Sequence, residues 1–559
     1  MKAYFYDNKF LKDLSIIYLL NIIFLIIFYN FSGIDMECDT SLSYMVGRTI
    51  HQVLFGGSYD AVMSFRPPGY PIFLMLSGVY FFESFWAIII AHSILTFISL
   101  GFIYYSFNLY KRFYAIAFSI TYILLFFLYT HIKGTAEMHL VNTLIVISVC
   151  SLIIFLKKEK IFFYYLSILS IIYAVFTRGD TAPLLITVFI CANLILFKLK
   201  KKFKNFFIIS LIIFLTFFIW TVSKGLFFYY YGNESELRNK KIFVETFISL
   251  SFNHQEGAQK FWRVQNYDRP NLNELYSTNI KNYLDLNNGP RSKELYEVLT
   301  KAFKTPHVVE KILKWKGRML GLGEDDVKID TWEKYYGEIK YNPKKIVDRI
   351  FDKNFESYYY PDQLREILAM SITRVKGDKL LQDVSNEIIS KNQNLQKVHF
   401  ESFIRAYGFR FNPIKNTINF EHQPNGIYLF NIDSFNAGNC PKIALPTKMY
   451  KEYLYEYEER SVLKNDNSKN FRDFVYYSRD KLRNVLGIIS ILSVLMLIFY
   501  KERLIPIFLN LSFIFSNMLV SNYVPPTGKV ENYLLSLAVF NAFYFIIFIK
   551  EKNFFLKKI

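Results

Sequence analysis

Long apolar runs alternate with short lysine-rich breaks along most of this chain. Most runs are roughly 18 to 22 residues long, the length that an α-helix needs to cross about 30 Å of hydrocarbon. They cover residues 14–32, 84–109, 113–131, 138–156, 161–177, 181–198, 206–224, 484–500, 504–522 and 532–549. The pattern predicts an all-α polytopic membrane protein with about ten transmembrane helices.

One further apolar segment, residues 70–82, is short for a membrane span and is expected to be re-entrant or interfacial. Counting it as a span would put three of the later basic clusters outside the membrane, whereas leaving it out puts them inside, as the positive-inside rule favours. We therefore expect cytoplasmic termini and an outer loop at 33–69. The chain then divides into a membrane module (1–224), an extracytoplasmic domain (225–483) and C-terminal transmembrane helices (484–559).

Composition and charge agree with a membrane protein. Hydrophobic residues make up 52% of the 559 positions, and the formal net charge is +19. In a soluble protein this charge would suggest a nucleic acid partner, but most basic clusters flank the apolar runs, so none is expected. The first run, Leu14–Phe31, is too long for a signal-peptide core and is expected to be a retained helix. Of the four cysteines, only Cys38 and Cys440 are placed to pair outside the membrane, and nothing in the sequence shows that they do.

The domain 225–483 is polar and rich in Tyr, Lys, Asn and Glu. Two stretches in it, residues 343–355 and 361–375, have the pattern of helices, and the domain is long enough for a core of its own. Its sequence has no metal-ligand spacing, glycine-rich phosphate loop or nucleophile elbow. We expect a mainly helical domain that, from its position alone, shapes an acceptor groove or covers a site.

Three carboxylates, Asp35, Glu37 and Asp39, directly follow the first predicted helix. In an extended segment alternate side chains point the same way, so all three could converge on one site. They suit a general base at the membrane surface, and they could hold a divalent cation. The alternative is that acidic residues at a helix exit are simply solvated.

A stiff turn of sequence Arg-Pro-Pro-Gly-Tyr-Pro occupies residues 66–71 and leads into the short apolar segment. Proline fixes the backbone angles and glycine permits a close approach, so Arg66 would be held at the depth of the interface. A guanidinium there can bind a lipid phosphate through two parallel hydrogen bonds. The alternative is a structural turn whose arginine snorkels to the headgroups.

Further ionisable residues lie near the predicted ends of later helices. Arg178 suits a phosphate clamp, or alternatively an ion pair with Asp180. Glu137 suits the orientation of a bound hydroxyl group or of Arg178, and the alternative is a carboxylate that stabilises the start of a helix. His51 and His92 have no partner at metal-ligand spacing and are interpreted as structural.

Taken together, these segments resemble the GT-C glycosyltransferases of the protein mannosyltransferase and aminoarabinose transferase superfamily, glycosyltransferase family 39 and its bacterial relatives. The shared features are an Asp after the first helix, a helix containing Ser and Tyr, and the Arg-Pro-Pro-Gly-Tyr-Pro turn. Residues 136–137, 176–178 and 531–533 follow where the family often has Ser-Glu, Thr-Arg and Glu-Arg-Tyr. The resemblance covers about residues 14–200 and, more weakly, 484–549, but not the large domain.

The resemblance implies an enzyme of the bacterial cytoplasmic membrane that transfers a sugar, on the extracytoplasmic side, from a polyprenyl-phosphate-linked donor to a glycan, lipid or protein acceptor. It implies an inverting displacement with Asp39 as the base. Asp35 is the second candidate, because Tyr44 falls one residue later than the family pattern predicts. The resemblance implies no definite cofactor. Whether Asp35, Glu37 and Asp39 hold a divalent cation is left open by the sequence.

Other roles also follow from the resemblance. The donor phosphate would be bound by Arg66, Arg178 and Lys529, the last being the cation nearest to Asn532, where the family has an arginine. The residues implied in substrate binding are Tyr44, Tyr70, Glu137 and Tyr533.

Two other functions compete with this interpretation. A lipid-linked glycan polymerase or ligase would place its basic and catalytic residues mainly in the large outer domain. A transporter or flippase of lipid-linked sugars would need broken helices in paired repeats near the middle of the membrane, whereas the charges here gather at one face. A membrane scaffold would need neither Asp39 nor Arg66.

Overall fold

The structure is a computed structural model. It describes residues 8–32, 38–55, 68–129, 137–178, 181–231, 289–319, 341–350, 367–368, 370–372, 374–390, 448–449, 451–452, 505, 540, 543–544 and 546–547. Within these residues every regular element is helical, as the apolar runs predicted.

The first seven predicted spans all correspond to helices. They are α1 (Asn8–Ser32), α5 (Phe85–Asn108), α6 (Arg112–Tyr129), α7 (Glu137–Lys158), α8 (Ile161–Thr177), α9 (Ala182–Lys198) and α10 (Lys204–Tyr231). Among the described residues, three segments are long and apolar enough to cross a membrane, at Asn8–Ile27, Trp86–Asn108 and Glu137–Lys158. Backbone polar groups are satisfied inside each helix, which is why an apolar run of this length in a membrane takes this form.

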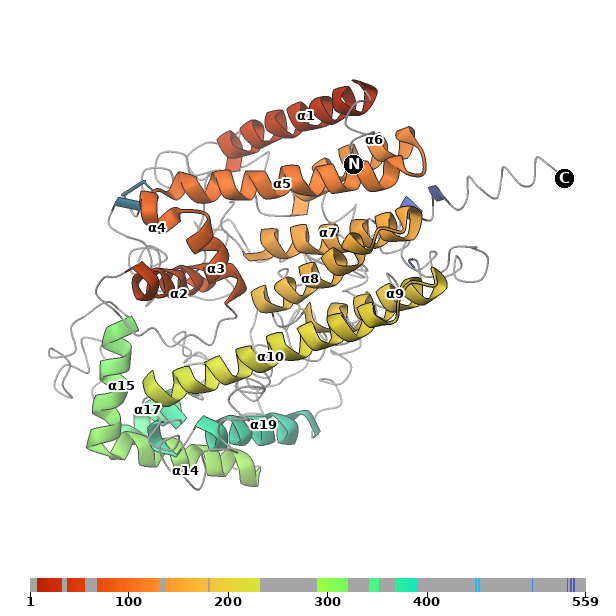
Figure 1. The fold of residues 1–559 in the computed structure, drawn as a ribbon. Helices are drawn as coiled ribbons and strands as arrows, with labels where there is room; N and C mark the ends of the chain where they lie inside the picture. The colour runs from red at the N-terminus through yellow and green to blue at the C-terminus, as the bar shows by residue number, and fades with distance from the viewer. Residues whose placement is uncertain are drawn as a thin grey trace.

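Helix α7 lies at the centre of the membrane module. In Figure 1 it runs beside α5 and α8, and both helices pack against it. Its apolar segment is 89% buried inside the protein, compared with 22% for that of α1 and 33% for that of α5. Side chains of α7 therefore contact protein on almost every side, while α1 and α5 keep an exposed apolar face.

The predicted short apolar segment is not one helix. It divides into α3 (Gly69–Leu76) and α4 (Val79–Phe82), separated by Gly78 at φ 78° in the left-handed region that glycine adopts readily. The eight residues of α3 rise only about 12 Å, so the segment does not span a bilayer. Helix α2 (Cys38–Phe55) packs on α3, and α3 packs on α8, at the end of the module where α7 begins.

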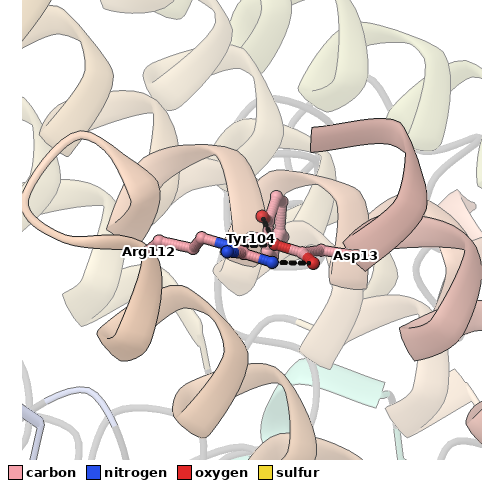
Figure 2. Close-up of polar contacts among 3 residues, drawn as sticks. All are labelled: Asp13, Tyr104 and Arg112. Atoms are coloured by element: carbon pink, nitrogen blue, oxygen red, sulfur yellow. Dashed lines mark hydrogen bonds and ion pairs between the residues drawn. The ribbon is translucent and has the colours of Figure 1, made fainter. Parts of the chain in front are cut away.

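At the opposite end of the membrane module, α1 is held by a cluster of three polar side chains (Figure 2). Buried Asp13 of α1 accepts from Arg112 of α6 through both carboxylate oxygens, at 2.5 Å from Nε and 2.7 Å from Nη2. The hydroxyl of Tyr104 in α5 donates to the same carboxylate at 2.7 Å. One aspartate thus joins three helices, and its charge is paired rather than isolated in an apolar layer.

The C-terminal spans are described only at single positions. Phe540 and Phe543 pack against Phe118, with ring centroids 5.0 and 4.1 Å away. Ile505 and Tyr544 belong to the same buried cluster. This region of the chain therefore returns to pack on α5 and α6, while the rest of the predicted spans at 484–500, 504–522 and 532–549 lies outside the described residues.

Four helices of the polar domain pack into a small bundle of their own: α14 (Pro290–Lys304), α15 (Pro306–Met319), α17 (Pro343–Ile350) and α19 (Arg374–Ser390). Helix α17 confirms the first part of the stretch predicted at 343–355. The helix predicted at 361–375 is not continuous, because residue 372 is in a turn and α19 begins at Arg374. The buried core of this bundle includes Leu295, Leu299, Phe303, Val309, Val347, Leu381 and Val384.

Candidate functional site

Several predicted site residues fall outside the described part of the chain. These are Asp35, Glu37, Arg66, Lys529 and Tyr533. Asp39 is the second residue of α2, and the position of its side chain is not described. The four predicted residues with described side chains are Tyr44 in α2, Tyr70 in α3, Glu137 in α7 and Arg178 after α8.

Glu137 and Arg178 form an ion pair between the start of α7 and the end of α8. Nη1 of Arg178 donates to Oε1 of Glu137 at 2.6 Å. The side chains are only 11% and 18% exposed, respectively. Glu137 is in the first turn of its helix and Arg178 is the C-cap of the other, so each charge is at the helix end that its sign favours. The sequence-based expectation that Glu137 orients Arg178 is consistent with this contact.

The start of α3 touches the same end of α8. A Cβ built on Gly69 would be 2.5 Å from Oγ1 of Thr177 and 2.6 Å from the backbone of Phe176, so only glycine fits there. The hydroxyl of Tyr173 also donates to the Gly69 carbonyl at 2.9 Å. The turn that follows Arg66 in sequence therefore ends within contact distance of the residues just before Arg178.

A group of buried polar side chains continues from Tyr70 into the helices. Oη of Tyr70 is 3.1 Å from Nε2 of His92 in α5. The rings of His92 and His139 in α7 are in edge-to-face contact, with centroids 4.6 Å apart. Nε2 of His139 is in turn 3.0 Å from Oγ1 of Thr96 in α5. Four side chains thus connect α3, α5 and α7, and His139 among them is two residues after Glu137 in α7.

Aromatic side chains surround Tyr70 on its α2 side. The ring centroid of Tyr44 is 6.5 Å from that of Tyr70, and the hydroxyl of Tyr80 donates to the Tyr44 carbonyl at 2.7 Å. Burial raises the pKa of the Tyr44 and Tyr70 hydroxyls well above the usual value, so both stay protonated and able to donate hydrogen bonds. His51 packs against the ring of Tyr80, which agrees with a structural role.

The polar domain reaches this cluster through a short segment. Met449 is fully buried against the cluster that contains Tyr44 and Tyr70. Three residues later, Oε2 of Glu452 accepts from Oγ of Ser84 at 3.0 Å. Ser84 is the N-cap of α5 and accepts from the backbone N–H of Trp86. The segment therefore joins the domain to the helices that carry the candidate site.

The sequence-based interpretation missed the central position of His92 and the contact of Tyr173 with Gly69. His92 was interpreted as structural because it lacks a partner at metal-ligand spacing. A usable signal was its place inside an apolar run, where an ionisable residue is a candidate functional residue by default. Its contacts could not be predicted from sequence, because Tyr70 lies 22 positions before His92 and His139 lies 47 positions after it.

The arrangement is suited to binding an anion. A guanidinium has five N–H donors in a planar fork, a geometry that matches the oxygens of a phosphate. Buried hydroxyls and imidazoles beside it can bind polar groups in a setting of low dielectric constant. Among the described side chains no group of three or more potential metal ligands occurs, and the carboxylates proposed for a cation lie outside that set.

Comparisons with known proteins were made at three levels. No family model, no characterised protein and no solved structure matches this chain.

Proposed function

We propose that the protein is a membrane glycosyltransferase that transfers a sugar from a polyprenyl-phosphate-linked donor to an acceptor on the extracytoplasmic side. The supporting observation is a convergence of three segments far apart in sequence. Gly69, Glu137 and Arg178 belong to the three stretches that carry the resemblance to GT-C enzymes, and they meet at one end of the membrane helices.

The location suits a lipid-linked substrate. Helix α3 is too short to span and lies against α8 beside helices with lipid-facing apolar surfaces. A polyprenyl tail can remain in hydrocarbon while its phosphate reaches the mostly buried guanidinium of Arg178. Arg66 is proposed as a second cation, because it precedes Gly69 by three residues. Lys529 and Tyr533 are proposed from sequence alone.

The reaction that we propose is a single displacement. An acceptor hydroxyl oxygen attacks the anomeric carbon, the bond from that carbon to the phosphate oxygen breaks, and polyprenyl phosphate leaves with the bonding electrons. Asp39 accepts the hydroxyl proton, a contribution of about 10² to 10⁴ in rate, with Asp35 as the second candidate base. Arg66 and Arg178 stabilise the charge that develops on the leaving phosphate. Because one displacement suffices, the anomeric configuration is inverted.

Tyr44, Tyr70 and Glu137 have supporting parts in this proposal. The two tyrosines are buried, protonated and next to the turn that ends at Gly69. Glu137 holds the guanidinium of Arg178 in one orientation. The polar domain is proposed to shape the acceptor side, since Met449 and Glu452 attach it to this end of the module.

The test is a direct measurement of the leaving group. Purified protein is reconstituted with a panel of polyprenyl-phosphate sugars and a membrane extract as acceptor source, and free polyprenyl phosphate is measured. We expect release by the wild type, and losses of at least about 100-fold in Asp39→Asn and about 10- to 150-fold in Arg178→Gln. Glu159→Gln is the matched control, since Glu159 forms an exposed ion pair with Lys201 at the other end of α7.

The alternatives predict different results. No release with any donor would overturn the glycosyltransferase proposal and favour a ligase or a flippase. Equal release by the wild type and Asp39→Asn would leave the reaction in place but remove Asp39 as the base. Loss of activity through substitution of charges in residues 225–483 alone would favour the polymerase or ligase.

A further inference from the structure

His92 occupies a special position in the membrane module. Its ring contacts α3 through Tyr70 and through Phe73, whose ring centroid is 5.3 Å away. On its other side it contacts His139 of α7, two residues beyond Glu137. The ring therefore lies between the helix that follows Arg66 and the helix that begins with Glu137.

Core filling alone does not account for a histidine at this place. The residue is 2% exposed, and its Nδ1 is buried with no hydrogen-bond partner among the described residues. A buried polar atom without a partner is unfavourable, whereas an apolar ring of similar size would fill the same space without that penalty. The compensating interaction is the hydrogen bond from Nε2 to Tyr70. It forms in either tautomer, because a tyrosine hydroxyl both donates and accepts.

We propose that His92 is a positioning residue that holds Tyr70, and with it the start of α3, beside the ion pair of Glu137 and Arg178. The inference rests on the proposed transferase function and deepens it. Helix α3 has only eight residues and its sequence begins three residues after Arg66. The contact through His92 sets the place of α3 relative to α7, while Gly69 sets its place relative to α8. Together they fix the spacing between the start of α3 and the ion pair of Glu137 and Arg178.

Spacing of this kind affects turnover more than stability. Displacing a binding group by about 1 Å can reduce a rate by about 100-fold even when the fold is intact. A residue that only fills the core would affect turnover only through the stability of the fold. The effect of substituting it would then be the same whether or not the Tyr70 hydroxyl is present. The two roles therefore differ in the coupling between His92 and Tyr70.

The first experiment is a double-mutant cycle on release of polyprenyl phosphate. We expect Tyr70→Phe and His92→Phe each to lower kcat by about 10-fold with donor KM changed by less than about twofold, and the double variant to lose no more than either single one. His92→Gln, whose amide can replace Nε2 in the bond to Tyr70, should recover most of the rate. Tyr165→Phe is the matched control, because it removes a tyrosine hydrogen bond of 2.9 Å, to Asn205, near the other end of α8.

Hydrogen exchange gives a second readout that needs no donor. Peptides covering α3 should exchange about fivefold faster in His92→Phe and Tyr70→Phe than in the wild type, while His92→Gln should match the wild type. Unchanged exchange in α3, or additive losses of kcat in the cycle, would overturn the positioning role. If the wild type releases no polyprenyl phosphate but α3 exchanges faster in His92→Phe, the transferase proposal fails and the link between His92 and α3 stands. If His92→Phe does not fold, Tyr70→Phe and His92→Gln decide the question.

Discussion

The ion pair of Glu137 and Arg178 gives the sharpest prediction, since its two members should respond differently to neutralisation. We consider Glu137→Gln and Arg178→Gln, which remove one charge each while keeping a side chain of polar character. The contact is 2.6 Å long, and the side chains are 11% and 18% exposed. In Glu137→Gln the amide oxygen can still accept from Nη1, whereas Arg178→Gln loses the planar fork entirely.

The expected size of the stability effect follows from this geometry. Two charge centres about 4 Å apart attract by about 4 kcal/mol at an effective dielectric constant of 20. Desolvation offsets part of that attraction, and each single variant leaves one charge mostly buried without its partner. We expect each substitution to lower the free energy of unfolding by about 2–4 kcal/mol, and the double variant to lose less than the sum of both. Glu159→Gln, in an exposed pair, should lose less than about 0.5 kcal/mol.

Turnover should separate the two variants. A charge-assisted hydrogen bond to phosphate contributes about 1.5–3 kcal/mol, so Arg178→Gln should lose about 10- to 150-fold in kcat/KM. Glu137→Gln keeps the arginine and should lose at least about 10-fold less. Thermal unfolding in detergent and release of polyprenyl phosphate, measured on the same preparations, check both parts. If the two variants lose the same factor in kcat/KM, and that factor follows their loss of stability, Arg178 does not bind phosphate and the ion pair is purely structural.

Three further predictions concern single positions. Asp13→Ala should lower the free energy of unfolding by about 3 kcal/mol in a detergent melt, because it removes the acceptor of three hydrogen bonds between helices. Gly69→Ala should reduce turnover and lower the free energy of unfolding by about 1–3 kcal/mol, since its Cβ would meet Thr177 at 2.5 Å. Gly101→Ala is the control and should be close to neutral in both assays, because its Cβ would have one contact, at 3.0 Å to a side-chain hydroxyl. Met449→Ala should lower the free energy of unfolding by about 2–4 kcal/mol, and an unchanged melting temperature would contradict the burial of Met449 in the cluster around Tyr44 and Tyr70.

The helices of the first 231 residues were largely predictable from sequence. A long apolar run in a membrane has few options besides a helix, so length and hydropathy located both ends of α5–α9 within about two residues. Helix α1 begins at Asn8, before the predicted start at 14, and α10 ends at Tyr231, after the predicted end at 224. The short segment at 70–82 was recognised as non-spanning, but its division at Gly78 was not predicted, because a left-handed glycine leaves no mark in hydropathy. The bond from Arg112 to Asp13 was also not predicted, since it joins residues 99 positions apart.

The candidate site was predictable in part. Orientation of Arg178 was one of the roles considered for Glu137, because both residues were placed at outer ends of predicted helices, and the structure pairs the two side chains. The link from Tyr70 to His92 was not, because it depends on how deeply α3 packs toward α5, which is set by tertiary contacts rather than by local pattern. Asp39, Arg66 and Lys529 remain predictions from sequence and resemblance.

The nearly complete burial of α7 also bears on how the protein is made. A chain that enters the membrane from its N-terminus releases α7 before α8, so the surface of α7 that α8 later covers first faces lipid or the insertion machinery. That surface belongs to a helix carrying the buried polar residues Asn142, Ser148 and Ser151. Until α8 arrives, serine hydroxyls can bond to carbonyls one turn back, whereas an asparagine amide has fewer such options. We therefore expect substitutions that weaken the contact of α7 with α8 to reduce the yield of inserted protein more than they reduce the stability of the finished fold.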